Sequence, residues 1–205
     1  MTLSEHYVLY VSEHGNKPAT VAALCKIAGI SEADFYKQYT SLNALEDSIW
    51  QAWIEETIQT VSSSEAYVNY SVREKYLAFC FGLTQKLLNV RSFVNWRFSS
   101  CRMREIYGFT RFKNSVKEHL NALVKEGLES GEIPSRFGIH RIYADAGWIH
   151  TIALIKYWLA DTSDGFEKTD EFIEKSTNFQ MDVITRNGLD SGAELGKFIF
   201  QQAWK

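Results

Sequence analysis

The chain has 205 residues, of which 45% are hydrophobic, and its formal net charge is −3 at pH 7. It is long enough to bury a substantial core, and one or two small domains are expected. Its three cysteines, Cys25, Cys80 and Cys101, are an odd number at wide spacings, which argues against a disulfide framework or a zinc site and indicates a reducing, cytoplasmic location.

The sequence gives no sign of a membrane protein or a secreted one. No basic-plus-apolar segment opens the chain, and the most apolar stretch, residues 142–160, contains Asp145, His150 and Lys156. We therefore interpret that stretch as a buried helix. Only two prolines occur, and most of the chain consists of long amphipathic segments without the alternation of β-strands, so the predicted class is all-α.

Residues 3–13 predict a first helix, with Leu3, Tyr7, Tyr10 and Val11 on one face, followed by a turn at residues 15–18.

Residues 20–39 predict two short helices that meet at a tight turn. Gly29 can adopt the left-handed backbone that ends a helix, and Ser31 is a good N-cap for the second helix. A further helix is predicted from Ser41 to about Val61. The apolar face of the helix before Gly29 consists of Val21, Leu24, Cys25 and Ala28.

This region resembles the DNA-binding domain of the tetracycline-repressor (TetR) family of bacterial transcriptional regulators. The resemblance implies an all-α fold with a helix-turn-helix DNA-binding domain in residues 1–61 and a ligand-binding and dimerisation domain in residues 62–205. The residues that carry it are Gly15, Thr20, Ala28-Gly29-Ile30-Ser31, Phe35-Tyr36, Tyr39, Ser41 and Leu45.

The resemblance also implies which residues meet DNA. The second short helix would lie in the major groove, and residues before it would touch phosphates. The predicted DNA-binding residues are Lys17, Thr20, Ser31, Glu32, Ala33, Tyr36, Lys37, Gln38 and Tyr39.

The N-terminal region departs from the family in its charge. Residues 1–61 contain three lysines, no arginine and eight acidic residues, a balance of −5, whereas DNA affinity depends on Lys and Arg. Leu42 stands where the family has a phosphate-binding Lys, and Asp34 stands where a small or hydroxyl residue is usual. These departures support an alternative hypothesis, in which a TetR-shaped protein has lost DNA binding and holds a lipid or protein partner.

The rest of the chain predicts further helices after a linker at residues 62–65. The segment 142–160 is apolar nearly all round, with Ile142, Ala146, Ile149 and Ala153 on one side, so it needs cover on both sides. In TetR-like proteins the last two long helices, here 142–160 and 167–184, form a four-helix bundle with their mates, which implies a homodimer. The other predicted helices are residues 72–90, a shorter helix holding Phe93 to Met103, 109–131 and 193–204.

A set of mainly aromatic residues lies in the segments that enclose a ligand cavity in the resembled family. Each one alone is best explained as core, but together they favour an apolar or aromatic small molecule. The predicted ligand-binding residues are Phe79, Leu83, Trp96, Phe98, Phe109, Phe112, Tyr143 and Trp148.

The remaining signals are weaker. Residues 73–141 carry a balance of +7, which fits a solvated face, an anionic ligand such as a fatty acid or acyl carrier, or a complement to the acidic N-terminal region. The five histidines show no metal-binding spacing, and His150 is interpreted as a hydrogen-bonded interface residue. No catalytic motif is present, so we expect no enzyme activity, no metal and no cofactor.

Overall fold

The structure is a computed structural model, and it describes residues 1–100, 109–135 and 140–185. Within these residues every regular element is helical, which confirms the predicted all-α class. The elements are α1 (Leu3–His14), α2 (Val21–Ala28), α3 (Glu32–Gln38), α4 (Leu42–Ser62), the 3₁₀ helix η1 (Glu65–Asn69), α5 (Val72–Leu88), α6 (Arg91–Ser100), α8 (Thr110–Ser130), α9 (His140–Ala160), the 3₁₀ helix η2 (Asp164–Phe166) and α10 (Glu167–Thr185).

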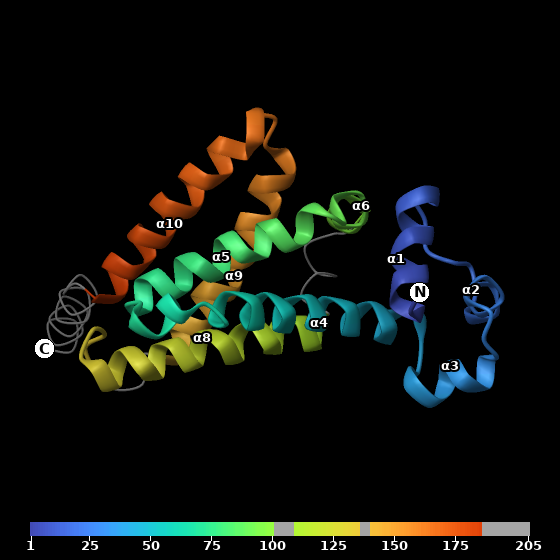
Figure 1. The fold of residues 1–205 in the computed structure, drawn as a ribbon, viewed down its shortest axis with the longest axis horizontal. Helices are drawn as coiled ribbons and strands as arrows, with labels where there is room; N and C mark the ends of the chain where they lie inside the picture. The colour runs from blue at the N-terminus through green and yellow to red at the C-terminus, as the bar shows by residue number, and fades with distance from the viewer. Residues whose placement is uncertain (101–108, 136–139, 186–205) are drawn as a thin grey trace, which may run out of the picture.

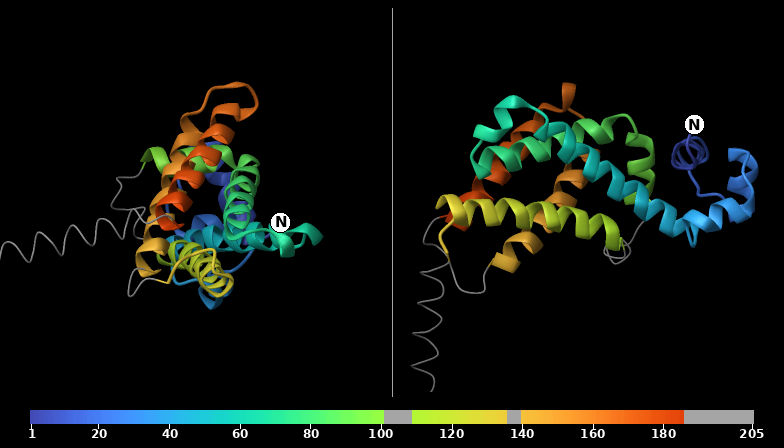
Figure 2. Two further views of the ribbon diagram at one scale, coloured as in Figure 1. Left: turned by 90° about the vertical axis from the view of Figure 1, so that its left-hand side faces the viewer. Right: turned by 60° about the horizontal axis from the view of Figure 1, so that its bottom comes forward.

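The first three helices form a head at one end of the molecule. Figure 1 shows α1, α2 and α3 clustered beyond α6, and the right-hand view of Figure 2 shows the same separation. The turn between α2 and α3 has the predicted form: Gly29 adopts a left-handed φ of 69°, and the Ser31 side chain accepts the Asp34 N–H. This arrangement is the predicted helix-turn-helix.

Side-chain caps set the starts of several helices. The hydroxyl of Thr2 caps α1 in a capping box with Glu5, and that of Thr20 caps α2. Ser41 caps α4, and Ser71 forms a second capping box at the start of α5. Each cap lies next to its helix in the sequence, so these starts are set locally.

Helix α4 connects the head to the other helices. Its buried residues Leu45, Ile49, Trp50 and Ile54 belong to one continuous core that also includes α1 and α8. Farther along, α5 crosses α4 so closely that a Cβ on Gly82 would lie 2.7 Å from Val61 Cγ1. The predicted domain boundary at residue 62 falls at the end of α4, and it stays a prediction.

The remaining helices have nearly the predicted bounds. Helix α8 packs along α9 and α4, while α10 packs along α5 and α9. The part of the short helix beyond residue 100 and the predicted helix 193–204 lie outside the described residues. No described helix combines the length and the apolar character that a bilayer crossing needs.

Candidate functional site

Helix α3 presents the predicted DNA-binding residues to solvent. Phe35 is fully buried and anchors the helix to the head, whereas Tyr36 keeps 53% of its surface exposed. Tyr39, at the C-cap, is half-buried. The other predicted residues on or beside this helix are all exposed; they are Ser31, Glu32, Ala33, Lys37 and Gln38.

A groove of about 480 Å³ lies beside this face, between the start of α2, Tyr36 and the start of α4. It brings together Lys17, Thr20 and Tyr36 of the predicted set. Lys17 Nζ donates a hydrogen bond to Asn43 Oδ1 at 2.9 Å. Asn43 was not among the predicted DNA-binding residues. The signal that could have identified it is its place in the first turn of α4, where free backbone N–H groups favour an anion.

The single lysine of α3 is paired within its own helix. Lys37 Nζ lies 2.7 Å from Asp34 Oδ1, and both side chains are largely exposed. The hydrogen bond from Lys37 and a second from Ser31 Oγ hold the pKa of Asp34 below its usual value. Because such exposed pairs are weak, Lys37 can leave Asp34 for a phosphate at little cost.

Three of the eight carboxylates in residues 1–61 lie on α4 and are engaged elsewhere in the molecule. Glu46 is buried, where it accepts a hydrogen bond from Tyr7 Oη at 2.9 Å and lies 2.6 Å from Arg97 Nε. Burial raises the pKa of Glu46. Asp47 accepts backbone N–H groups at the start of α8, and Glu56 pairs with Lys86 of α5. The balance of −5 therefore overstates the negative charge near α3.

The predicted ligand-binding residues lie mostly in the core. Phe112 of α8 stacks on Trp50 at 5.0 Å between ring centroids, and Trp148 of α9 meets Phe112 edge-on at 4.9 Å. Phe98 and Phe109 also contact Trp50, which the predicted set omitted although it is the centre of the cluster. Of the remaining predicted ligand-binding residues, Phe79, Leu83 and Tyr143 are buried and Trp96 is half-buried.

Three ring nitrogens in this region are buried without a hydrogen-bond partner in the described structure: Trp50 Nε1, His119 Nε2 and Trp148 Nε1. Buried donors are normally paired, so such atoms call for an explanation. His119 packs against Phe79 at 4.8 Å, and burial lowers the pKa of His119 to about 4.

A polar cluster joins α5, α9 and α10. His150 Nδ1 lies 2.7 Å from Tyr76 Oη, and its Nε2 lies 2.7 Å from Ser176 Oγ. His150 is thus hydrogen-bonded inside its own subunit, and burial lowers its pKa to about 4. Beside it, an apolar cavity of about 20 Å³ is lined by residues that include Tyr76, Tyr143 and Met181. No group of three His, Cys, Asp or Glu side chains in the described ranges could hold a metal ion.

Apolar side chains of α9 and α10 are left uncovered by the described residues of the chain. Ile142 and Ile149 of α9 are 61% and 58% exposed, and Phe179 of α10 is 72% exposed. Ala146 and Ala153 lie on the same side of α9 and are also exposed. An isolated soluble subunit rarely leaves such a surface in water, so this face favours contact with another chain.

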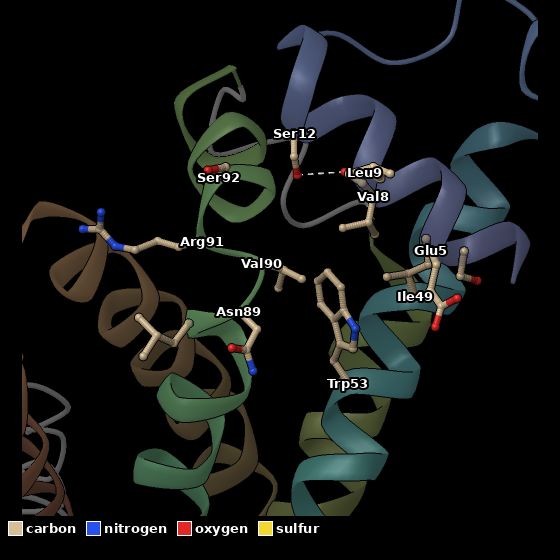
Figure 3. Close-up of a pocket in the computed structure, with 12 residues that line it drawn as sticks. Glu5, Val8, Leu9, Ser12, Ile49, Trp53, Asn89, Val90, Arg91 and Ser92 are labelled. Carbon is tan, nitrogen blue, oxygen red and sulfur yellow. Dashed lines mark hydrogen bonds between the residues drawn. The ribbon is translucent and has the colours of Figure 1, made fainter. Parts of the chain in front are cut away.

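A second open cleft lies where the head meets α5 and α6. Its volume is about 420 Å³, and its walls come from α1, α4 and the connection between α5 and α6 (Figure 3). None of the predicted ligand-binding residues lines it.

Residues 75–199, more than half of the chain, match a family model described as "Tetracyclin repressor-like, C-terminal domain". No curated protein matches the chain.

Solved structures are similar over nearly the whole chain. The fatty acid degradation regulator FadR from Bacillus halodurans has a TM-score of 0.61 at 15% identity, covering 87% of this chain and 92% of its own. A putative TetR-family transcriptional regulator from Rhodococcus sp. has a TM-score of 0.61 at 15% identity, with coverages of 90% and 97%. The dihydroxyacetone kinase operon activator DhaS has a TM-score of 0.55 at 15% identity, with coverages of 90% and 96%. At these identities the likeness shows the fold.

Proposed function

Because the chain belongs to the TetR family of transcriptional regulators, we propose that it is a homodimer that binds specific DNA sequences through α3. Binding of a small hydrophobic effector would raise or lower its affinity for DNA. Residues 1–61 would form the DNA-binding domain, and residues 62–205 the ligand-binding and dimerisation domain. The protein would act in the cytoplasm. Members of this family are generally not enzymes.

The observation that carries the proposal is the display of α3. Phe35 fixes the helix to the core of the head, while Tyr36 and Lys37 point away from it and are exposed. A recognition helix must be held rigidly and must present side chains that can reach base edges in the major groove. The groove beside it, with Lys17 and the first turn of α4, suits a backbone phosphate.

The uncovered face of α9 and α10 supports the dimer. Two heads related by a two-fold axis can meet two DNA half-sites, so a dimer through these helices suits sequence-specific binding. In the proposal, the apolar side chains Ile142, Ile149 and Phe179 pack against the same face of the partner.

The effector site is proposed within the aromatic cluster around Trp50 and Trp148. Their unpaired indole N–H groups would donate hydrogen bonds to an acceptor on a mainly apolar ligand. For allosteric control the effector must bind the two head arrangements with different affinity.

A second candidate function is binding of a lipid or protein partner without DNA. Glu32 and Asp34 on the exposed face of α3 favour it, because they repel phosphates, and Leu42 cannot supply the missing positive charge.

A binding assay with the promoter DNA of the protein's own gene, at about 50 mM salt where electrostatic attraction is strong, tests the proposal. We expect the wild type to bind, and Lys37→Ala to weaken binding about tenfold or more, because one base or phosphate contact is worth roughly 1–3 kcal/mol. Asp34→Asn should strengthen binding, since it frees Lys37 and removes a negative charge.

The matched control is Lys125→Ala on α8. Lys125 pairs with Glu129 in its own helix and is as exposed as Lys37, so the same charge is removed far from the head. DNA affinity should not change. If the wild type fails to bind under these conditions, the second candidate function replaces the first.

A further inference from the structure

The open cleft between the head and the C-terminal helices has its own lining but borders the aromatic cluster, because Trp53 of its floor meets Trp50 edge-on at 5.1 Å between ring centroids. Val8 and Leu9 of α1 line one side, Ile49 and Trp53 of α4 form the floor, and Val90 stands opposite α1 (Figure 3). Leu88 also lines the cleft. Leu9 and Leu88, which both line the cleft, keep 44% and 41% of their surface exposed. A volume of about 420 Å³ lies within the range that holds small ligands.

The charge of this cleft is set by Glu5. The cleft's other ionisable residue, Arg91, points away from it in Figure 3, toward α9. There Arg91 Nη2 donates to Leu159 O at 3.0 Å, and its guanidinium lies over the rings of Trp158 and Phe166. Arg91 is therefore held by other partners. The exposed Glu5 carboxylate lies beside Ile49, where its Oε2 accepts the Thr2 N–H at 2.8 Å.

The remaining polar groups add hydrogen-bonding capacity without positive charge. They are Ser4, Ser12, Asn89 and Ser92, and the Ser12 hydroxyl already donates to Val8 O at 2.8 Å. Trp53 offers an aromatic face in the same space, and indole rings attract cations. The lining thus combines apolar walls, an aromatic ring and one carboxylate. Its one positively charged residue, Arg91, points away from the cleft.

From this lining, we propose that the cleft binds a small lipophilic cation, such as an aromatic or alkyl amine. The apolar body would lie on Leu9, Trp53 and Leu88, and the ammonium group would face Glu5. An anion of the same shape would meet Glu5 with its own charge and is disfavoured. This site is additional to the effector site proposed above, and it does not depend on DNA binding.

An occupant of the cleft would touch both the head and the helices behind it. Val8 and Leu9 belong to α1, whereas Leu88 is the last residue of α5 and Val90 lies in the connection between α5 and α6. Ligand filling this space fixes the separation between these two walls. The site therefore couples binding of the cation to the orientation of the head.

The test compares two probes of nearly the same shape and opposite charge, 2-naphthylmethylammonium and 2-naphthoate, by titration calorimetry with the full chain. We expect the ammonium probe to bind once per chain and at least tenfold more tightly than the naphthoate. Glu5→Gln should remove that preference. It should also leave the start of α1 intact, because a glutamine still completes a capping box with Thr2.

Two further variants test whether the ammonium probe binds in this cleft. Leu88→Trp fills the cleft at a partly exposed position, so it should abolish binding of the ammonium probe while the chain stays folded. Glu13→Gln removes an exposed carboxylate of α1 outside the cleft and should leave binding unchanged. Equal affinity for both probes, unchanged binding in Glu5→Gln, or unchanged binding in Leu88→Trp would each overturn the proposal.

Discussion

Two buried histidines make the stability of the folded chain sensitive to mild acid. Burial lowers the pKa of His119 and His150 from 6.5 to about 4. The unfolded chain takes up protons at these residues below pH 6.5, whereas the folded chain does not until about pH 4. Acid therefore favours unfolding across this window, by up to roughly 1.4 kcal/mol per pH unit for each histidine.

His119→Leu should reduce this loss. We expect urea unfolding of the wild type to show lower stability at pH 5 than at pH 6, and the variant to lose about 1 kcal/mol less over that interval. His14→Gln, at an exposed position on α1, is the control and should follow the wild type. Equal losses in His119→Leu and the wild type would mean that His119 is protonated in the fold.

At the scale of helices, the start of α8 depends on a residue far away in the sequence. Phe109, at its N-cap, makes no side-chain hydrogen bond to the helix. Instead, Asp47 of α4 accepts the N–H groups of Arg111 at 3.1 Å and of Phe112 at 3.2 Å. A carboxylate at the N-terminus of a helix also interacts favourably with the positive end of the helix dipole.

Asp47→Ala should lower the free energy of unfolding by about 0.5–2 kcal/mol, the usual range for the loss of an N-cap. Asp47→Asn should cost less, since the amide oxygen can still accept. Urea titration measures both, with Glu55→Ala on the exposed side of α4 as control. No difference between Asp47→Ala and Glu55→Ala would contradict the capping role.

Whole-molecule organisation depends on the buried polar contact between the head and α6. Tyr7 of α1 and Arg97 of α6 both bind Glu46, and Arg97 also lies 4.2 Å from the ring of Phe109. Glu46→Ala removes a buried carboxylate from a cation that is only 14% exposed and from a buried hydroxyl, so we expect a loss of about 3–5 kcal/mol.

The exposed pair of Glu56 and Lys86 provides the comparison, because it also joins α4 to another helix. Glu56→Ala should cost less than about 1 kcal/mol. Chemical denaturation followed by circular dichroism distinguishes the two. Similar losses of unfolding free energy in both variants would show that the buried contacts of Glu46 stabilise the fold no more than an exposed ion pair does.

The proposed dimer depends on the apolar side of α9. Ile149→Asp places a charge in the middle of the uncovered face of α9, so the proposed dimer should dissociate, as measured by sedimentation velocity. Val68→Asp, at an exposed apolar residue of η1, should leave the dimer intact. A wild type that sediments as a monomer would refute the proposed interface.

The sequence alone determined the helices and the turn between α2 and α3. Helical spacing, the glycine at Gly29 and hydroxyl caps such as Ser31 are local features, and their energetics involve neighbours a few residues away. The same local pattern carried the resemblance to the TetR family. For the predicted DNA-binding residues, sequence predicted the helix that displays them but not the pairing of Lys37 with Asp34.

Tertiary structure alone decided where the charges and cavities lie. The acidic count of residues 1–61 suggested a surface that repels DNA. Yet Glu46 pairs with Arg97 of α6 and Asp47 accepts N–H groups of α8, each more than forty residues away along the chain. Likewise, Trp50 became the centre of the aromatic cluster, and Glu5 and Leu88 came to line one cleft, only through packing. Such contacts arise from the crossing of helices, which residue spacing within one helix does not encode.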